Sequence, residues 1–142
     1  MLTNKDYCDY ETCVALKELG FPQDTSLARY ALVNKWVDYC TFKKGQLITS
    51  EDRFFFNTTE ESIIAPLLYL AQKWLREEKE FYVFVGREWE NAYYYWLSKK
   101  DEDKTVGITH SFYYSNEEGQ FSSYEEALSE GIKEAVKILK ER

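Results

Sequence analysis

Residues 81–97 read FYVFVGREWENAYYYWL, and this stretch contains two segments that predict strands. Residues 81–85 are all apolar or aromatic, which is typical of a strand that is buried on both faces and is therefore central in its sheet. Residues 92–97 place aromatic side chains at both sets of alternating positions, and aromatic residues favour strands. We interpret the stretch as two successive strands of one sheet.

A third strand is predicted further along the chain. One set of residues alternates there with smaller or more polar neighbours: Val106, Ile108, His110, Phe112 and Tyr114. A period of two indicates a strand with one face buried. The acidic run 101–103 and the polar run 116–119 form the connections on either side.

Two helical patterns flank these strands. Pro66 suits the first turn of a helix, and an apolar stripe follows it at Leu67, Leu70, Ala71, Trp74 and Leu75. Ser123 and Glu126 match a capping box, and a second stripe follows at Leu128, Gly131, Ile132, Ala135, Val136 and Leu139. Residues 58–142 are therefore predicted to fold as helix–strand–strand–strand–helix, with amphipathic helices packed on one face of an antiparallel sheet.

The N-terminal part, residues 1–57, is predicted to hold a helix and a hairpin. Asp9 is a good N-cap residue, and Gly20 followed by Pro22 ends the helix. Residues 25–50 fit either a helix or strands, and the turn signal at 43–45 favours a hairpin. The chain of 142 residues is thus predicted to be one α+β domain spanning 1–142.

Charge and composition narrow the choice of partners. The net charge is −7, and residues 58–142 carry 11 basic and 17 acidic side chains, so we expect no direct binding of nucleic acid. Three cysteines, no secretory leader and no long apolar run predict a cytoplasmic protein that does not enter a membrane.

Motifs for catalysis and cofactor binding are missing from the sequence. Three cysteines and one histidine are too few for a usual structural zinc site, and the six glycines form neither a Walker motif nor a dinucleotide fingerprint. We therefore predict no catalytic residue, no metal and no cofactor. His110 stays a weak candidate, because any Ser-His or Cys-His nucleophile would need the single histidine. A half-buried structural ring is the favoured interpretation.

The aromatic residues around 89–96 are the most unusual feature. If one strand face lies under the helices, the other presents rings to solvent or to a partner. Trp89, Tyr94 and Trp96 are therefore a candidate surface for a protein partner or for self-association, since Tyr and Trp are enriched at interfaces. The alternative is that residues 25–56 cover this face.

Several short motifs, taken in order, resemble one family. They are Tyr10-Glu11, Leu16-Lys17-Glu18-Leu19-Gly20-Phe21, Ala65-Pro66, Lys73-Trp74-Leu75-Arg76-Glu77-Glu78, Tyr124-Glu125-Glu126-Ala127-Leu128 and Gly131-Ile132. The chain resembles an uncharacterised family of short proteins encoded by gut Bacteroidota and their phages or integrated elements. The resemblance implies a mobile-element context and no catalytic residue.

Three hypotheses for function follow. The first is a non-enzymatic accessory or interaction protein that acts through the aromatic strand face or through self-association. The second is a small enzyme that uses His110 with a nearby carboxylate. The third is an acidic mimic of nucleic acid, a hypothesis suggested by the excess of acidic side chains in residues 58–142.

Overall fold

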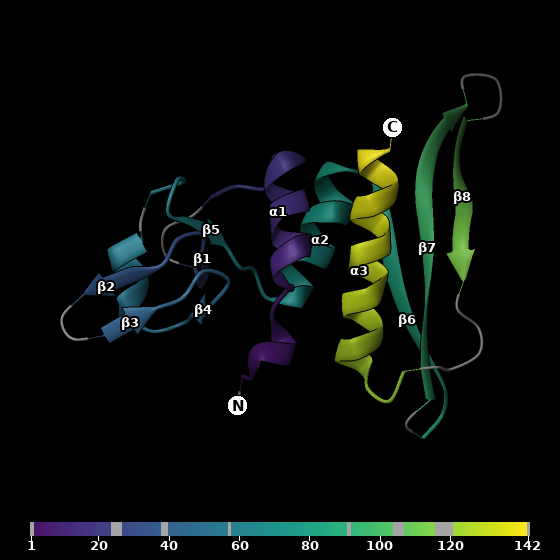
Figure 1. Ribbon diagram of the computed structural model, residues 1–142. Helices are drawn as coiled ribbons and strands as arrows, with labels where there is room; N and C mark the ends of the chain where they lie inside the picture. The colour runs from purple at the N-terminus through teal and green to yellow at the C-terminus, as the bar shows by residue number, and fades with distance from the viewer. Residues whose placement is uncertain are drawn as a thin grey trace. The chain divides into compact units, whose positions relative to one another are not determined.

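The computed structural model describes residues 2–23, 27–37, 40–56, 58–90, 92–103, 107–115 and 121–141 (Figure 1), and at 88, 89, 100–103 and 107–115 it describes the backbone alone. The chain divides into two compact units, Met1–Leu67 and Leu68–Arg142. Helices are combined with antiparallel sheets, so the predicted α+β class is confirmed. That residues 1–142 form a single domain stays a prediction.

The first unit combines helical turns with short strands. Its helical elements are the 3-10 helix η1 (Asn4–Asp6), α1 (Tyr10–Glu18) and the 3-10 helix η2 (Glu51–Phe56). Its strands are β1 (Arg29–Ala31), β2 (Lys35–Val37), β3 (Cys40–Phe42), β4 (Leu47–Ile48) and β5 (Ser62–Ile64). Strand β1 is the middle strand of the antiparallel sheet β4-β1-β5, and β2 pairs with β3.

Helix α1 begins and ends where the sequence predicts. The Thr12 N–H donates to Asp9 Oδ1 at 2.7 Å, which is the expected N-cap bond. Gly20 has φ +101°, and the Phe21 N–H donates to the Leu16 carbonyl at 2.9 Å, which closes the last turn. A left-handed glycine followed by this bond is the Schellman ending.

The described residues between 27 and 50 form strands rather than a helix. Strand β2 pairs with β3, and β4 returns beside β1 after a turn at Lys44 and Gly45. Gly45 has φ +89°, a conformation that glycine adopts without steric cost. The buried side chains Ala31, Phe42, Ile48 and Phe56 form a small core in this unit.

Strand β5 was not expected from the sequence. Residues 62–64 pair with β1, so the first unit extends to Leu67 and includes a segment that the periodicity had left outside the strands. Three residues are too few for a periodic signal. Their pairing with β1 joins residues more than thirty positions apart in the sequence, which local pattern does not report.

The second unit has the predicted order of elements. Helix α2 (Leu68–Glu78) precedes strands β6 (Phe81–Trp89), β7 (Ala92–Asp103) and β8 (Gly107–Ser115), and helix α3 (Tyr124–Lys140) follows them. The strands form one antiparallel sheet in the order β6-β7-β8. Both helices lie on the same face of this sheet (Figure 1), which confirms the predicted packing.

The position of β6 corrects one prediction. In the described sheet β7 is central and β6 lies at the edge, although residues 81–85 were predicted to form a central strand. Both faces of β6 are apolar, but for different reasons: one face is buried under the helices, and the other carries stacked aromatic rings. Phe81 and Val83 are buried, whereas Tyr82 and Phe84 stack on each other and on a neighbouring strand.

Helix α3 approaches the sheet very closely. A Cβ atom added at Gly131 would lie 2.7 Å from Val83 Cγ1 and 3.2 Å from Tyr95 Cγ, so any larger residue here would force these side chains to shift. Ser123 Oγ accepts from the Glu126 N–H at 3.1 Å, as the capping box predicts, but the Glu126 carboxylate reaches Ser122.

Among the described residues, no helix is both long enough and apolar enough to span a bilayer.

Candidate interaction surface

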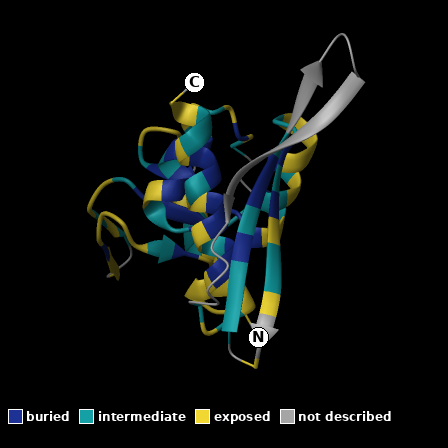
Figure 2. Ribbon diagram, turned by 90° about the vertical axis from the view of Figure 1, so that its right-hand side faces the viewer, coloured by how far each residue is buried: buried dark blue, intermediate teal, exposed yellow. Residues whose placement is uncertain are grey.

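The register of β6 and β7 assigns their side chains to two faces. Gly131 of α3 touches Val83 and Tyr95, so these two residues lie on the helix-covered side, where both are buried. Since successive strand residues point to opposite faces, the residues directly before and after Val83 in β6, and before and after Tyr95 in β7, lie on the other side of the sheet. We call that set the aromatic face; its members are Tyr82, Phe84, Tyr94 and Trp96. Figure 2 views this side of the sheet.

The four rings form one continuous row. Tyr82 and Phe84 stack with centroids 6.0 Å apart and an interplanar angle of 7°. Phe84 stacks on its cross-strand partner Trp96 at 5.0 Å and 19°. Trp96 stacks on Tyr94 at 5.7 Å and 28°. Each stacked pair contributes roughly 0.5–1.5 kcal/mol beyond the burial of area, so the row holds its rings in fixed positions.

Gly86 provides the space in which the ring of Tyr94 lies. The two residues are register partners, and a Cβ atom added at Gly86 would lie 2.4 Å from Tyr94 Cζ and 2.5 Å from its hydroxyl oxygen. An aromatic ring laid across a glycine of the neighbouring strand covers backbone that the glycine leaves bare. The end of the row is therefore set by a glycine and not only by its aromatic residues.

Exposure differs along the row. Phe84 is 39% exposed, and the other three rings are half-buried because each covers part of its neighbour. A rigid row of partly exposed Tyr, Phe and Trp side chains has the composition that is enriched at protein interfaces. Its chemistry suits apolar and edge contacts to a partner rather than a reaction.

The structure brings together two of the three residues that the sequence singled out. Tyr94 and Trp96 stack on each other, and the sequence analysis missed Tyr82 and Phe84, which complete the row. Their signal is the presence of aromatic side chains within residues 81–85, a stretch whose uniformly apolar character predicts a strand buried on both faces. The backbone of Trp89 pairs with Ala92 past a register shift, and its side chain lies outside the described residues. That residues 25–56 cover this face stays an alternative prediction.

His110 is placed by its backbone alone. It lies in β8 opposite Lys100 of β7, and its side chain lies outside the described part of the structure. The hypothesis of a His110-based enzyme is untested and stays a hypothesis. Within the residues that the structure describes, no group of three or more His, Cys, Asp or Glu side chains could hold a metal ion.

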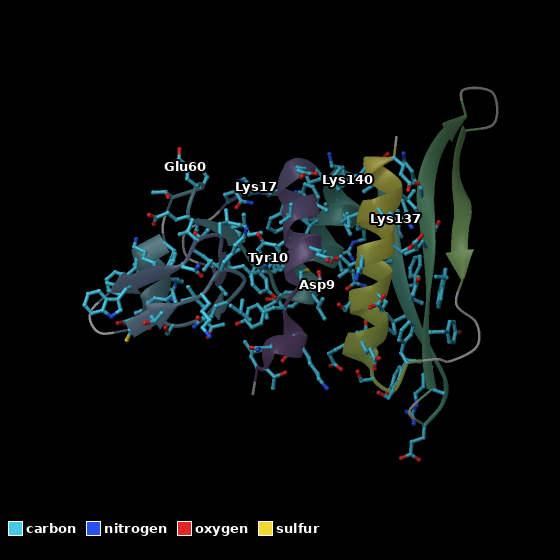
Figure 3. The ribbon with its side chains drawn as sticks, viewed as in Figure 1. Asp9, Tyr10, Lys17, Glu60, Lys137 and Lys140 are labelled. Carbon is cyan, nitrogen blue, oxygen red and sulfur yellow. The ribbon has the colours of Figure 1, made fainter. Side chains whose placement is uncertain are left out.

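The buried cysteines belong to the start of α1, where Figure 3 labels Asp9 and Tyr10. Cys8 precedes the N-cap and Cys13 is the fourth helical residue, which are the two positions of a hydrophobic staple. The Cys13 thiol donates to the Cys8 carbonyl at 3.7 Å, and Tyr30 Oη donates to the same carbonyl at 2.6 Å. The hydrogen bond with Cys8, and then burial, raises the pKa of Cys13, which is typical of a structural thiol.

Comparisons with known proteins give the chain no relative. Searches against protein-family models, curated proteins and solved structures found no match. The geometry of the aromatic face is therefore the basis for the functional argument.

Proposed function

We propose that this chain is a non-enzymatic accessory protein of a phage or mobile element, which binds a protein partner or a second copy of itself through the aromatic face. The observation that carries the proposal is the row of four stacked rings on the side of the β6-β7-β8 sheet opposite to α2 and α3. The helices bury the inner face, so the outer row is not needed to form that core.

The energetics of binding support such a role. Tyr and Trp residues are the commonest hot spots of interfaces, and truncating one typically costs about 2 kcal/mol or more of binding energy. Side chains that are already fixed lose little conformational entropy when a partner covers them. Stacking fixes the rings of the aromatic face before any partner arrives.

The first experiment measures the molar mass of the full chain by light scattering over a range of protein and salt concentrations. Phe84→Lys is the main variant, because Phe84 is the most exposed ring of the row. Tyr69→Lys is the matched control, since Tyr69 is 58% exposed on α2 and lies outside the aromatic face. Self-association through the face is expected to weaken at least tenfold in Phe84→Lys, about 1.4 kcal/mol, and to be unchanged in Tyr69→Lys.

A monomeric wild type directs the test to a foreign partner. A protein captured from the native host is then titrated against wild type, Phe84→Lys and the double variant Tyr94→Ala, Trp96→Ala. Equal affinity for all three proteins, together with an unchanged oligomeric state, would show that the aromatic face is not the binding surface. Circular dichroism of each variant establishes that it is folded.

A further inference from the structure

The aromatic face leaves parts of its rings uncovered. Its neighbouring rings are nearly parallel, with interplanar angles of 7–28°, but their centroids are 5.0–6.0 Å apart. Carbon atoms in contact lie only about 3.5–4.0 Å apart, so each ring covers only part of its neighbour. The row therefore presents partial ring faces and ring edges, held at fixed spacings, to a molecule that lies against it.

Two side chains of the row also carry hydrogen-bond donors. Trp96 has an indole N–H and Tyr94 has a phenolic hydroxyl, and both side chains are half-buried. Within the described part of the chain, neither donor has a hydrogen-bond acceptor. Such groups usually find an acceptor when they are buried, so a partner that covers the row should supply one. The face therefore suits a ligand that combines apolar groups with free acceptors.

A proline-rich segment combines these two properties. In the polyproline II conformation the backbone makes no internal hydrogen bonds, so its carbonyls are available as acceptors. Proline adds an apolar ring and has no N–H that would be left without a partner. The ring hydrogens next to its amide nitrogen are slightly positive and are attracted to the negative faces of aromatic rings. The conformation also exists before binding, which lowers the entropic cost of docking on an aromatic surface.

Charge narrows the choice of segment. The four rings are uncharged, whereas residues 58–142 carry 17 acidic and 11 basic side chains. Tyr94 is the register partner of Gly86, so its end of the row leads towards the turn between β6 and β7, where Glu90 is exposed. A segment with basic residues beside its prolines is attracted to such a surface. A second copy of the chain, which carries the same net charge of −7, gains no such attraction.

We propose that the aromatic face binds a proline-rich segment in the polyproline II conformation, with arginine or lysine beside its prolines. This inference rests on the binding role proposed above and names the partner of the same face. The proline rings pack on Tyr82, Phe84 and Trp96. The Trp96 N–H and the Tyr94 hydroxyl donate to carbonyls of the segment, and its basic residues lie at the Glu90 end of the row.

Fluorescence anisotropy with labelled peptides tests the proposal on the wild-type chain alone. The probe is a peptide of about ten prolines followed by a pair of arginines. One control peptide replaces the prolines with alternating glycine and serine, and the other replaces the arginines with glutamates. We expect the probe to bind about tenfold more tightly than either control, or better. Equal affinities of the probe and the glycine–serine peptide would overturn the proposal, because charge alone would then explain the binding.

Neutral variants locate the binding on the aromatic face. Phe84→Thr should weaken binding of the probe by about tenfold. Trp96→Phe keeps a ring but removes the N–H donor, and should weaken binding by about fivefold. Tyr69→Ala removes an exposed ring of α2 outside the row and should bind the probe as wild type does. Circular dichroism establishes that each variant is folded, and unchanged affinity in both Phe84→Thr and Trp96→Phe would overturn the proposal.

The outcome for the partner is separate from the outcome for the proposed function. If wild type does not bind the probe, but Phe84→Lys still weakens self-association or binding of a captured partner, the proline-rich assignment is wrong and the binding role of the face stands. A dimer that forms through the face and ignores the probe assigns the face to a second copy. If changes in the row alter none of these interactions, both proposals fail.

Discussion

The three thiols of the chain are predicted to differ sharply in reactivity. Cys40 is exposed, whereas Cys8 and Cys13 are both about 1% exposed. Burial shields both thiols from the reagent, and the raised pKa of Cys13 in addition leaves little of its reactive thiolate. A thiol-specific disulfide reagent should therefore label one cysteine quickly in the native protein and all three in urea.

The identity of the fast thiol is checked with two single variants. Cys40→Ser should remove the fast phase and leave the slow labelling unchanged. Cys13→Ser should keep the fast phase. A native protein with three equally fast thiols would contradict the packing of the α1 staple.

At the scale of elements, the contact between α3 and the sheet predicts the effect of Gly131→Ala. Alanine is the better helix former by about 1 kcal/mol, which alone would stabilise α3. The new Cβ, however, would lie 2.7 Å from Val83 Cγ1, and overpacking costs roughly 1–3 kcal/mol. We expect a net loss of about 1 kcal/mol in the free energy of unfolding by urea.

Glu130→Ala is the matched control for that substitution. Glu130 is exposed on the same helix, so its replacement tests helix propensity without the contact to the sheet. It should change the free energy of unfolding by less than about 0.5 kcal/mol. Stabilisation by Gly131→Ala would mean that α3 lies further from β6 than described.

The edge strand β6 makes a second prediction at this scale. Gln72 of α2 donates from Nε2 to the Val83 carbonyl of β6 at 2.8 Å, and thereby satisfies a backbone group of an edge strand. Gln72→Ala removes this partner, which we expect to destabilise the protein by about 1 kcal/mol. Unsatisfied edge groups also invite pairing with another chain, so aggregation on prolonged storage should increase.

Lys73→Ala, a change at the exposed neighbouring residue, serves as the comparison for Gln72→Ala. Stability is measured by urea unfolding and association by light scattering. If both variants behave like wild type in both measurements, Gln72 does not protect the edge.

At the scale of the whole molecule, the sequence predicted the elements whose signals are local. The N-cap Asp9 and the terminating Gly20 predict where α1 begins and ends, and the Ser123 cap predicts where α3 begins. Each of these signals lies within a few residues of the helix end that it determines. The pairing of β5 with β1 was missed, since that contact is long-range. The burial of Arg29 in β1 was missed for a related reason: an arginine in a short strand is usually exposed, and only the tertiary structure buries this one.

The candidate site was predictable in part for the same physical reason. The aromatic excess at 92–97 identified Tyr94 and Trp96 as a surface. Apolar residues on both faces of 81–85, however, fit a central strand as well as an edge strand that carries stacked rings. Only the register separates these cases, because it places Phe84 opposite Trp96 and leaves β6 with one strand neighbour in the described sheet.

The stability of the whole chain is predicted to fall in alkaline solution. The pKa of Cys13 is raised above its ordinary value of 9.0, and burial raises the pKa of Tyr30 above 10.0, so both groups stay neutral in the fold. The unfolded chain ionises first. The stabilisation is therefore complete below pH 9.0 and is lost progressively as the pH rises above it.

Urea unfolding at a series of pH values from about 7 to about 11 checks this dependence. Cys13→Ala should flatten part of the alkaline decline, whereas Cys40→Ser, a change at an exposed position outside the α1 packing, should leave the profile as it is in wild type. A Cys13→Ala profile that declines as steeply as wild type would contradict the assignment.

The ring of Tyr94 over Gly86 means that these two positions cannot be redesigned one at a time. A side chain at 86 displaces the ring, and a small residue at 94 removes the reason for the glycine. Gly86→Ala should therefore disturb the near-ultraviolet spectrum in wild type but be almost silent in a Tyr94→Ala background, giving a non-additive double-mutant cycle. Any library that varies the surface of this sheet must therefore change residues 86 and 94 together, as a coupled pair.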